Sequence, residues 1–429
     1  MKIIAVNGYK AVGRNMTGIS VGRETIALDN GIRLDTMQMY DSELRSLKSF
    51  PIKKLIEMDI LTQPDRLKNV IAQVVSHAHL DHYGSIPFHK PKVPIISTHY
   101  TNELIKKDYK EGNYISLNYG ERYEISKNFE LEFIEISHSI PYSAIVVLYT
   151  KDGIVVYASD FKLDNFSNIN KPDYKSLKKL GKEGVKALIA ESVRVKEKGK
   201  TPSEIVVIDK LRDIFSIIDD GLIIVATFST HMERIGNIIK EAENLNRKII
   251  IMGRSLLKNI SVARSFNLFE LKGNIKVVAS SKAIKNSLTE IKRGKRDEYL
   301  LIVTGHQGEP DSILSRMASD KLPFRFQKGD SVIFCSDVIP SPINFASRYA
   351  LETKLRMKKV KIFDSVHVSG HASREDHRYL IKLLKPEHII PCHGNIEMRS
   401  SYAELCLEEG YELQKSVHIL RNDSYVKIG

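Results

Sequence analysis

Residues 76–84 concentrate metal-binding side chains, with the sequence Ser-His-Ala-His-Leu-Asp-His-Tyr-Gly. Imidazole nitrogens together with one or two carboxylates suit a borderline cation such as zinc. His77 and His79, two residues apart on an extended turn, can point the same way and bind one ion. Asp81 and His82, where a helix is expected to begin, turn toward a second ion. This crowding favours two neighbouring ions over the alternative, a solvated histidine-rich turn.

Four apolar strands further along the chain each end close to a side chain that could bind a metal ion or transfer a proton. These side chains are His138 after the strand expected at 131–136, Asp160 after 154–159, Glu191 after 187–190 and His393 after 388–391. Because strand ends meet at the edge where a sheet presents its site, we expect these residues to converge. For His138, Asp160 and His393 taken singly, a structural role is the alternative.

The candidate ligands divide into two sets that share one carboxylate. The sets are His77, His79 and His138 for one ion, Asp81, His82 and His393 for the other, with Asp160 placed to bridge both. Two zinc ions per chain, about 3.5–4 Å apart, can hold a shared water and lower its pKa toward neutrality. Asp29, which follows the strand expected at 25–28, is predicted to orient a ligand histidine rather than to bind metal.

The composition is that of a soluble globular protein with two domains. The 429 residues are 42% hydrophobic and 27% charged, and no apolar run approaches the ~20 residues that span a bilayer. The three cysteines show no paired spacing and the first residues are strand-like, so we expect a reduced, cytoplasmic protein. The net charge of +13 favours an anionic partner, most commonly nucleic acid, although a Lys-rich surface without such a partner is the alternative.

The second half of the chain alternates short strands with helices. Strands are expected at 222–225, 248–251, 275–278, 300–303, 332–334 and 361–363, and helices at 232–244, 312–318 and 396–409. This alternation predicts a parallel, doubly wound sheet. In the first half, a polar, helix-prone segment is expected from Asp41 to about Leu67.

The ordered set His77-x-His79-x-Asp81-His82, His138, Asp160 and His393 resembles the metallo-β-lactamase superfamily. The resemblance implies an αβ/βα sandwich with a dinuclear zinc site at the sheet edge. The doubly wound block between Asp160 and His393 resembles the β-CASP domain of the nucleic-acid-cleaving branch, whose further motifs are matched by Glu191, His371 and His393. The expected domains are 1–196 and 361–429 for the metallo-β-lactamase fold and 197–360 for the β-CASP insertion.

Within that branch the chain is most similar to the RNase J family, archaeal type, through Gly305-His306-Gln307-Gly308-Glu309-Pro310 among other stretches. The resemblance implies processive 5′-to-3′ degradation of single-stranded RNA with a preference for a 5′-monophosphate. The alternatives are a β-CASP endoribonuclease of the RNA 3′-end processing type and a non-catalytic RNA-binding subunit, although the latter would have lost ligands present here. We do not expect the extra C-terminal domain of bacterial members, so the dimer built with that domain cannot be carried over to this chain. A homo-oligomer and an RNA-decay complex both stay open as its assembly.

Further residues are expected to contact the RNA. Ser369-Gly370 forms a turn suited to a phosphate oxygen, and His371 could donate a proton to the leaving 3′-oxygen with Glu191 holding its ring and Asp81 alongside. The alternative is that His371 only caps the helix expected near Ser373. The resemblance implies that Ser229, Thr230 and His231, before a helix N-terminus, bind the 5′-phosphate together with Ser369 and Gly370. His367 is a further candidate for contact with the substrate phosphate.

Overall fold

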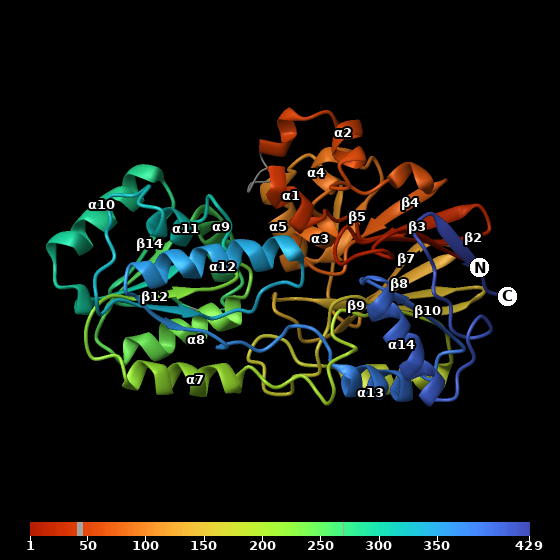
Figure 1. Ribbon diagram of the computed structural model, residues 1–429. Coiled ribbons are helices and arrows are strands. Elements are labelled where there is room, and N and C mark those ends of the chain that lie inside the picture. Colours follow the sequence, from red (N-terminus) through yellow and green to blue (C-terminus); the bar gives the residue numbers. More distant parts are fainter. Residues whose placement is uncertain (41–45, 269) are drawn as a thin grey trace. The chain divides into compact units, whose positions relative to one another are not determined.

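The computed structural model describes residues 1–40, 46–268 and 270–429, and its chain divides into two compact units (Figure 1). Unit 1 comprises Met1–Met37, Glu43–Thr201 and Gly370–Gly429, and unit 2 comprises Gln38–Ser42 and Pro202–Ser369. The larger segment of unit 2, Pro202–Ser369, is therefore an insertion between two parts of unit 1.

The first sheet of unit 1 has seven strands in the order β19-β1-β2-β3-β4-β5-β6. The strands are β1 (Lys2–Asn7), β2 (Met16–Val21), β3 (Glu24–Leu28), β4 (Val70–Val74), β5 (Ile95–Thr98), β6 (Tyr114–Leu117) and β19 (Ser424–Lys427). The half from β19 to β3 is antiparallel and the half from β3 to β6 is parallel. The parallel half brings the carboxyl ends of β3 and β4 together, and these strands lead into the loops that begin at Asp29 and Val75.

The second sheet of unit 1 has six strands in the order β18-β11-β10-β9-β8-β7. The strands are β7 (Arg122–Ser126), β8 (Phe129–Glu135), β9 (Ala144–Thr150), β10 (Gly153–Ala158), β11 (Val185–Glu191) and β18 (His388–Cys392). Strands β10, β11 and β18 are parallel neighbours, so their carboxyl ends also lie at one edge. The residues that follow them include Asp160, Ser192 and His393.

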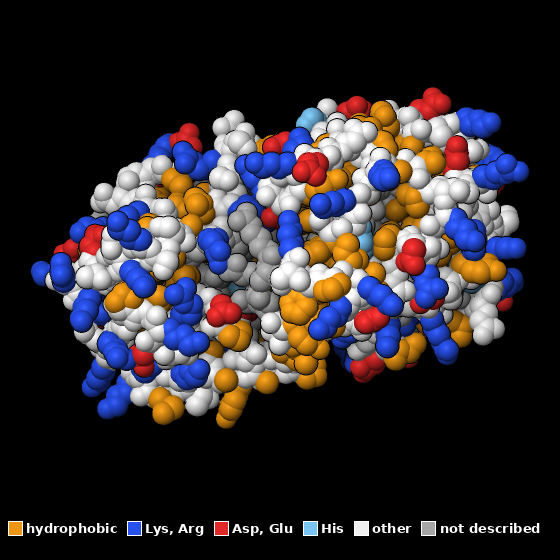
Figure 2. Space-filling view, turned by 90° about the horizontal axis from the view of Figure 1, so that it is seen from above, with side chains coloured by type: hydrophobic (Ala, Val, Ile, Leu, Met, Phe, Trp, Pro, Cys, Tyr) orange, Lys and Arg blue, Asp and Glu red, His pale blue; other side chains and the backbone are white. Residues whose placement is uncertain are grey.

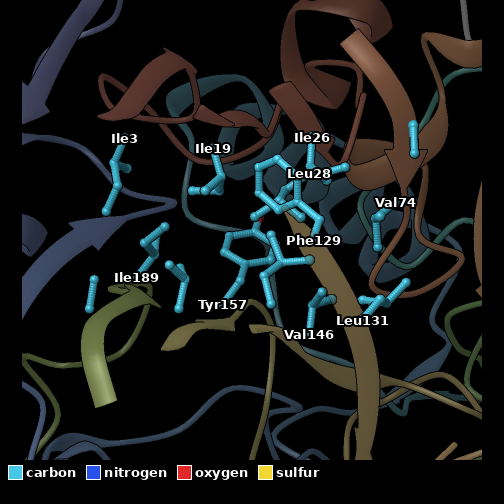
Figure 3. Close-up of a cluster of buried hydrophobic side chains, with 14 of the residues drawn as sticks. Ile3, Ile19, Ile26, Leu28, Val74, Phe129, Leu131, Val146, Tyr157 and Ile189 are labelled. Atoms are coloured by element: carbon cyan, nitrogen blue, oxygen red, sulfur yellow. The ribbon is translucent and has the colours of Figure 1, made fainter. Parts of the chain in front are cut away.

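A core of side chains fills the space between the two sheets (Figure 3). Strand β8 shows the cause, because Phe129, Leu131 and Phe133 are buried while the residues between them are half-exposed. The opposite face of the second sheet packs against α6 (Tyr174–Glu183), α13 (Arg374–Leu384) and α14 (Ile396–Glu408). Further helices of unit 1 are α2 (Ile52–Glu57), α3 (Leu80–Tyr83), α4 (Ile86–His89) and α5 (His99–Asp108). The αβ/βα sandwich expected for unit 1 is confirmed.

Unit 2 contains a six-stranded sheet in the order β14-β13-β15-β12-β16-β17, with every pair parallel. Its strands are β12 (Ile223–Ala226), β13 (Lys248–Met252), β14 (Ile275–Val278), β15 (Tyr299–Val303), β16 (Ser331–Phe334) and β17 (Lys361–Phe363). Its helices are α7 (Ile205–Ser216), α8 (Met232–Glu243), α9 (Arg254–Ser265), α10 (Ser281–Arg293), α11 (Ile313–Ala318) and α12 (Pro342–Met357). Figure 1 shows α7 and α8 on one side of this sheet and α12 on the other, which confirms the doubly wound architecture.

The helix-prone segment expected from Asp41 to about Leu67 is less regular than predicted. Helix α1 begins earlier, at Leu34, and the later part contains only α2 and two 3₁₀ turns, Ser46–Ser49 and Pro64–Arg66. Residues 41–45 lie outside the described residues. Pro51 and Pro64 explain the fragmentation, because proline starts a helical turn readily but cannot continue one from within. Among the described residues, no helix combines the length and apolar character needed to cross a membrane.

Candidate metal centre and active site

Helix α3, which carries Asp81 and His82, is held in place by the segment around Asn15. The backbone N–H and the side-chain amide of Asn15 both donate to the Asp81 carbonyl, at 3.0 and 3.1 Å. Gly31 lies so close that a Cβ there would stand 1.6 Å from the Asp81 carbonyl oxygen. Only glycine fits at position 31, because the lack of a side chain lets its loop pack directly against the backbone of α3.

The first ligand group consists of His77, His79, His138 and Asp160. His79 Nδ1 lies 3.2 Å from His77 Nε2 and 3.1 Å from His138 Nε2. Asp160 Oδ2 lies 3.6 Å from each of those two Nε2 atoms. Four donor atoms therefore face one point at the edge of the sandwich.

The second ligand group consists of Asp81, His82, His393 and again Asp160. His82 Nε2 lies 3.5 Å from Asp81 Oδ2 and 3.3 Å from Asp160 Oδ2. His393 Nε2 lies 3.6 Å from Asp81 Oδ2 and 3.3 Å from Asp160 Oδ1. The two oxygens of Asp160 thus face both groups, which is the geometry of a bridging ligand.

The two groups fit metal ions better than they fit hydrogen bonds among themselves. Donor atoms around a tetrahedral zinc ion with bonds of about 2.0–2.1 Å stand roughly 3.3 Å apart, close to the separations found here. Asp160 Oδ1 and His393 Nε2 are buried and have no hydrogen-bond partner among the described residues. Within each group the ligand atoms all lie within 4.8 Å of one another. Together these residues form a His/Asp metal-binding cluster.

Asp29 stands behind this cluster with its side chain fully buried. Its Oδ2 lies 2.7 Å from His82 Nδ1 and accepts a hydrogen bond of 2.8 Å from the Tyr157 hydroxyl. Both the backbone N–H and the hydroxyl of Ser76 also donate to Asp29, at 2.8 and 3.0 Å. A carboxylate held in this way fixes the proton of His82 on Nδ1 and leaves Nε2 directed at the second ligand group.

The remaining ligand histidines have different partners on their second nitrogen. His138 Nδ1 donates to the Gly370 carbonyl at 2.7 Å, and His77 Nδ1 lies 3.0 Å from the Ser76 hydroxyl. His393 differs, because its Nδ1 accepts a 3.2 Å hydrogen bond from the Gly13 backbone N–H. A histidine that accepts on Nδ1 carries its proton on Nε2 when neutral, so metal binding by His393 requires this bond to give way.

Burial keeps three of the imidazoles neutral. It holds the pKa of His77 and His138 well below the ordinary value and lowers the pKa of His79 to about 4. A neutral imidazole has a lone pair to give to a metal ion, whereas an imidazolium has none. The first ligand group is therefore in its metal-binding protonation state at neutral pH.

In the second ligand group, charged neighbours outweigh the effect of burial on the pKa values. Burial works against the charge of His82, yet the carboxylates of Asp160, Asp81 and Asp29 raise its pKa well above the ordinary value. Burial likewise opposes ionisation of Asp81, but His82 lowers its pKa to about 2. Three carboxylates around one imidazole make a site that attracts positive charge, from a proton or from a metal ion.

His371 and Glu191 form a pair beside both groups. His371 Nδ1 lies 3.0 Å from Glu191 Oε2, and His371 Nε2 lies 4.0 Å from Asp160 Oδ2. Burial opposes the charge on this imidazole, but Glu191 and Asp160 raise its pKa to about 9. His371 does not cap α13, because Ser373 is the cap and Asp376 accepts its backbone N–H. The alternative in which His371 only caps this helix is wrong.

The phosphate-contact candidates of unit 2 lie at the carboxyl ends of its strands. Ser229 and Thr230 follow β12 and are half-exposed, whereas His231 is 3% exposed. His231 caps α8 by accepting the Arg234 backbone N–H on Nδ1. His367 follows β17, and its Nδ1 lies 2.7 Å from Arg234. A phosphate contact by any of them stays a prediction.

Gly370, also predicted to contact phosphate, serves the cluster from unit 1. Its carbonyl accepts from His138, and a Cβ at this position would come within 3.0 Å of the His138 ring and 2.9 Å of Ser139. Glycine is thus required here by the packing around a ligand histidine, whatever the residue does toward RNA.

The sandwich of unit 1, its inserted parallel sheet and the His/Asp cluster define a metallo-β-lactamase-fold hydrolase of the β-CASP branch. The model of the family described as "Ribonuclease J, beta-CASP domain" matches residues 220–348, and "Zn-dependent metallo-hydrolase RNA specificity domain" matches 357–420. Ribonuclease J of Pyrococcus abyssi is 46% identical, with 100% of this chain and 97% of the relative covered. The chain belongs to the ribonuclease J family.

Other comparisons agree with this family. Ribonuclease J of Methanocaldococcus jannaschii is 42% identical, with 98% of this chain and 97% of the relative covered. Ribonuclease J of Helicobacter pylori is 30% identical over 100% of this chain, which spans 61% of that relative. A solved structure of a protein of unknown function from Enterococcus faecalis V583 shares the fold, with a TM-score of 0.68, 18% identity and 99% of both chains covered. The protein is therefore a β-CASP nuclease of a Zn-dependent metallo-hydrolase family, and its substrate is RNA.

Proposed function

We propose that this ribonuclease removes nucleotides processively from the 5′ end of single-stranded RNA, prefers a 5′-monophosphate and uses two zinc ions per chain. The observation that carries the proposal is the sharing of Asp160 by two ligand groups beside the His371–Glu191 pair. Zinc bound there would supply Lewis acidity and lower the pKa of a water molecule toward neutrality. The proposal assigns the metal to His77, His79, Asp81, His82, His138, Asp160 and His393, with Asp29 behind His82.

The proton for the leaving 3′-oxygen is assigned to His371. With a pKa near 9 this imidazole carries a proton at neutral pH, and its Nε2 faces the cluster at 4.0 Å from Asp160. Glu191 accepts from Nδ1 and also receives the backbone N–H groups of Phe161 and Val193, at 3.3 and 3.2 Å. The carboxylate is therefore fixed, and it fixes the imidazole that donates the proton.

The 5′-phosphate is assigned to unit 2. Ser229 and Thr230 offer hydroxyls before the N-terminus of α8, and His367 and Ser369 lie in the segment after β17.

The proposed domain boundaries are 1–196 and 361–429 for the metallo-β-lactamase domain and 197–360 for the β-CASP domain. Strand β17, at the start of the closing segment, pairs with β16 of the inserted sheet. The three cysteines are free and buried, which supports a reducing, cytoplasmic location.

The decisive experiment is digestion of RNA labelled at its 3′ end and carrying a 5′-monophosphate, a 5′-triphosphate or a 5′-hydroxyl. We expect mononucleotide products and the fastest decay for the monophosphate. A circular RNA of the same sequence is the matched control, because a pure exonuclease leaves it intact and an endonuclease cuts it. Equal rates on all three ends, with cleavage of the circle, would contradict the exonuclease proposal and favour the endonuclease.

A further inference from the structure

Arg234, in the first turn of α8, is fully buried at the centre of a hydrogen-bond network in unit 2. Its Nε and Nη2 donate to the two carboxylate oxygens of Glu204, both at 2.7 Å. Its Nη1 donates to the Cys335 carbonyl at 3.0 Å, and Nη2 also donates to the Val368 carbonyl at 2.9 Å. A buried charge with a bidentate partner and two carbonyls is a rigid anchor.

The same guanidinium determines where His367 carries its proton. Arg234 Nη1 lies 2.7 Å from His367 Nδ1. Arginine has only donors and keeps its charge in proteins, so Nδ1 of this histidine must accept. A neutral imidazole that accepts on Nδ1 has its proton on Nε2. A doubly protonated His367 would set an N–H against the guanidinium and is excluded while this contact holds.

The surroundings agree with a neutral ring that donates outward. His367 is 11% exposed, so one side of its side chain reaches solvent. Asp337 Oδ2 lies 4.0 Å from His367 Nε2, and the Asp337 side chain is 57% exposed. The ring of Phe228 lies 6.5 Å from the His367 ring and belongs to the loop that carries Ser229 and Thr230.

We propose that Arg234 is a positioning residue that holds His367 as a neutral imidazole with its proton on Nε2, so that His367 donates a hydrogen bond to the 5′-phosphate of RNA. The phosphate part of this inference rests on the proposed function. Glu204 balances the buried charge, and the bond to Val368 fixes the backbone next to the histidine. A neutral donor keeps its hydrogen bond across neutral pH, whereas a free histidine would change its charge there.

The first test measures the tautomer directly on the wild-type protein. Long-range ¹H–¹⁵N correlation spectra of ¹⁵N-histidine-labelled protein, with His367→Asn to assign the signals, should show an unprotonated Nδ1 and a protonated Nε2. These signals should stay unchanged between pH 5 and pH 8. A protonated Nδ1, or titration within that range, would overturn the proposal without any need for a variant that folds poorly.

The second test separates the two ring nitrogens by substitution. The amide of glutamine in His367→Gln can donate from the position of Nε2, whereas the shorter side chain in His367→Asn reaches only the position of Nδ1. We expect His367→Gln to keep most of the preference for 5′-monophosphate over 5′-hydroxyl RNA in kcat/KM. His367→Asn should lose about 10- to 100-fold of it, as for a hydrogen bond to a charged group.

Arg234→Lys provides the test of the positioning residue itself. One ammonium group cannot bond Glu204 bidentately and also reach His367, so the variant should lose the fixed tautomer and the same preference for 5′-monophosphate over 5′-hydroxyl RNA in kcat/KM. An end preference that survives in both Arg234→Lys and His367→Asn would overturn this inference alone. If the wild type shows no end preference, the proposed function fails, and the phosphate contact falls with it.

Discussion

The Tyr157 hydroxyl donates a 2.8 Å hydrogen bond to Asp29 directly behind the metal cluster, and this bond connects the two sheets of unit 1. Tyr157 belongs to β10 of the second sheet, and Asp29 follows β3 of the first. Asp29 in turn lies 2.7 Å from His82 Nδ1. The packing of the two sheets is therefore connected to the orientation of a ligand histidine by a chain of two hydrogen bonds.

Tyr157→Phe should weaken metal binding without unfolding the protein. The variant keeps the buried ring but removes one donor to Asp29, so His82 is held less firmly, and loss of such outer partners typically lowers metal affinity by about 10- to 100-fold. Zinc affinity measured by competition with a chelator checks this. Tyr149→Phe, which removes a hydroxyl bonded to Glu132 at 2.7 Å, is the matched control and should bind zinc normally.

Asp160→Ala should abolish activity and lower the zinc content below two ions per chain. Its carboxylate faces both ligand groups, so its removal affects two sites at once. Elemental analysis of purified protein after reconstitution with zinc measures the content. At most one transition metal per wild-type chain under the same conditions would refute the two-zinc proposal.

His371→Ala should separate metal binding from catalysis. The imidazole bonds to Glu191 rather than joining either of the two ligand groups assigned to zinc, so the variant should keep both zinc ions and its fold. Its cleavage rate should fall by about 10²–10⁴, the usual contribution of a general acid. Zinc analysis and single-turnover kinetics on the same sample check both parts. A zinc ion lost from this variant would identify His371 as a ligand instead.

RNA affinity should fall steeply as salt is added. The chain carries a net charge of +13, and Figure 2 shows Lys and Arg side chains spread over the visible face with fewer Asp and Glu between them. Each phosphate contact on a single strand contributes a slope of about −0.7 in log affinity against log salt. Fluorescence anisotropy with labelled RNA between low and moderate salt measures the slope, and a flat line would argue against a basic RNA path.

The Glu204–Arg234 pair should make stability depend on acid pH. Burial opposes ionisation of Glu204, but Arg234 and His231 hold its pKa well below the ordinary value. A carboxyl whose folded pKa is depressed contributes stability above its unfolded pKa of about 4.3, and this contribution is lost as pH falls further. Glu204→Gln should therefore cost about 3–5 kcal/mol at pH 7 and progressively less in acid, measured by urea unfolding.

The control for this prediction is Asp209→Asn. Asp209 also pairs with an arginine in unit 2, but its side chain is 62% exposed and that of its partner Arg212 is 55% exposed. Solvent screens such a pair, so the variant should cost about 1 kcal/mol or less and add little pH dependence. Equal costs for the two amide variants would show that the buried network is not special.

The architecture could be predicted from the sequence because the pattern of hydrophobic residues shows where the strands lie. The short apolar segments before His138, Asp160 and His393 are strands β8, β10 and β18. Strands β10 and β18 both pair in parallel with β11, and β8 runs in the same direction because the antiparallel strand β9 lies between it and β10, so the three ends lie at one edge. The histidine cluster was recognisable because three imidazoles within six residues have few other uses. Both signals are local, so no knowledge of the fold is needed to read them.

The supporting residues were not predictable in the same way. Tyr157 reads as a core residue on an apolar strand, and Arg234 reads as one cation of an amphipathic helix, although each makes a specific buried bond. Gly370 was assigned to phosphate, yet its carbonyl orients His138 from far along the sequence. The strand at 361–363 was assigned to the closing segment, whereas β17 pairs with β16, because three apolar residues do not reveal which sheet they join.

The pairing of β11 with β18 has a consequence for how the protein acquires its site during synthesis. Glu191 is in register with Cys392, although the segment Pro202–Ser369 of unit 2 is translated between them. Chains grow from the N-terminus, so β11 waits with an open edge while the inserted sheet is made. Of the residues assigned to the site, His371 and His393 are translated last. On that assignment, the ribosome-bound chain lacks its proton donor and one metal ligand until synthesis is almost complete.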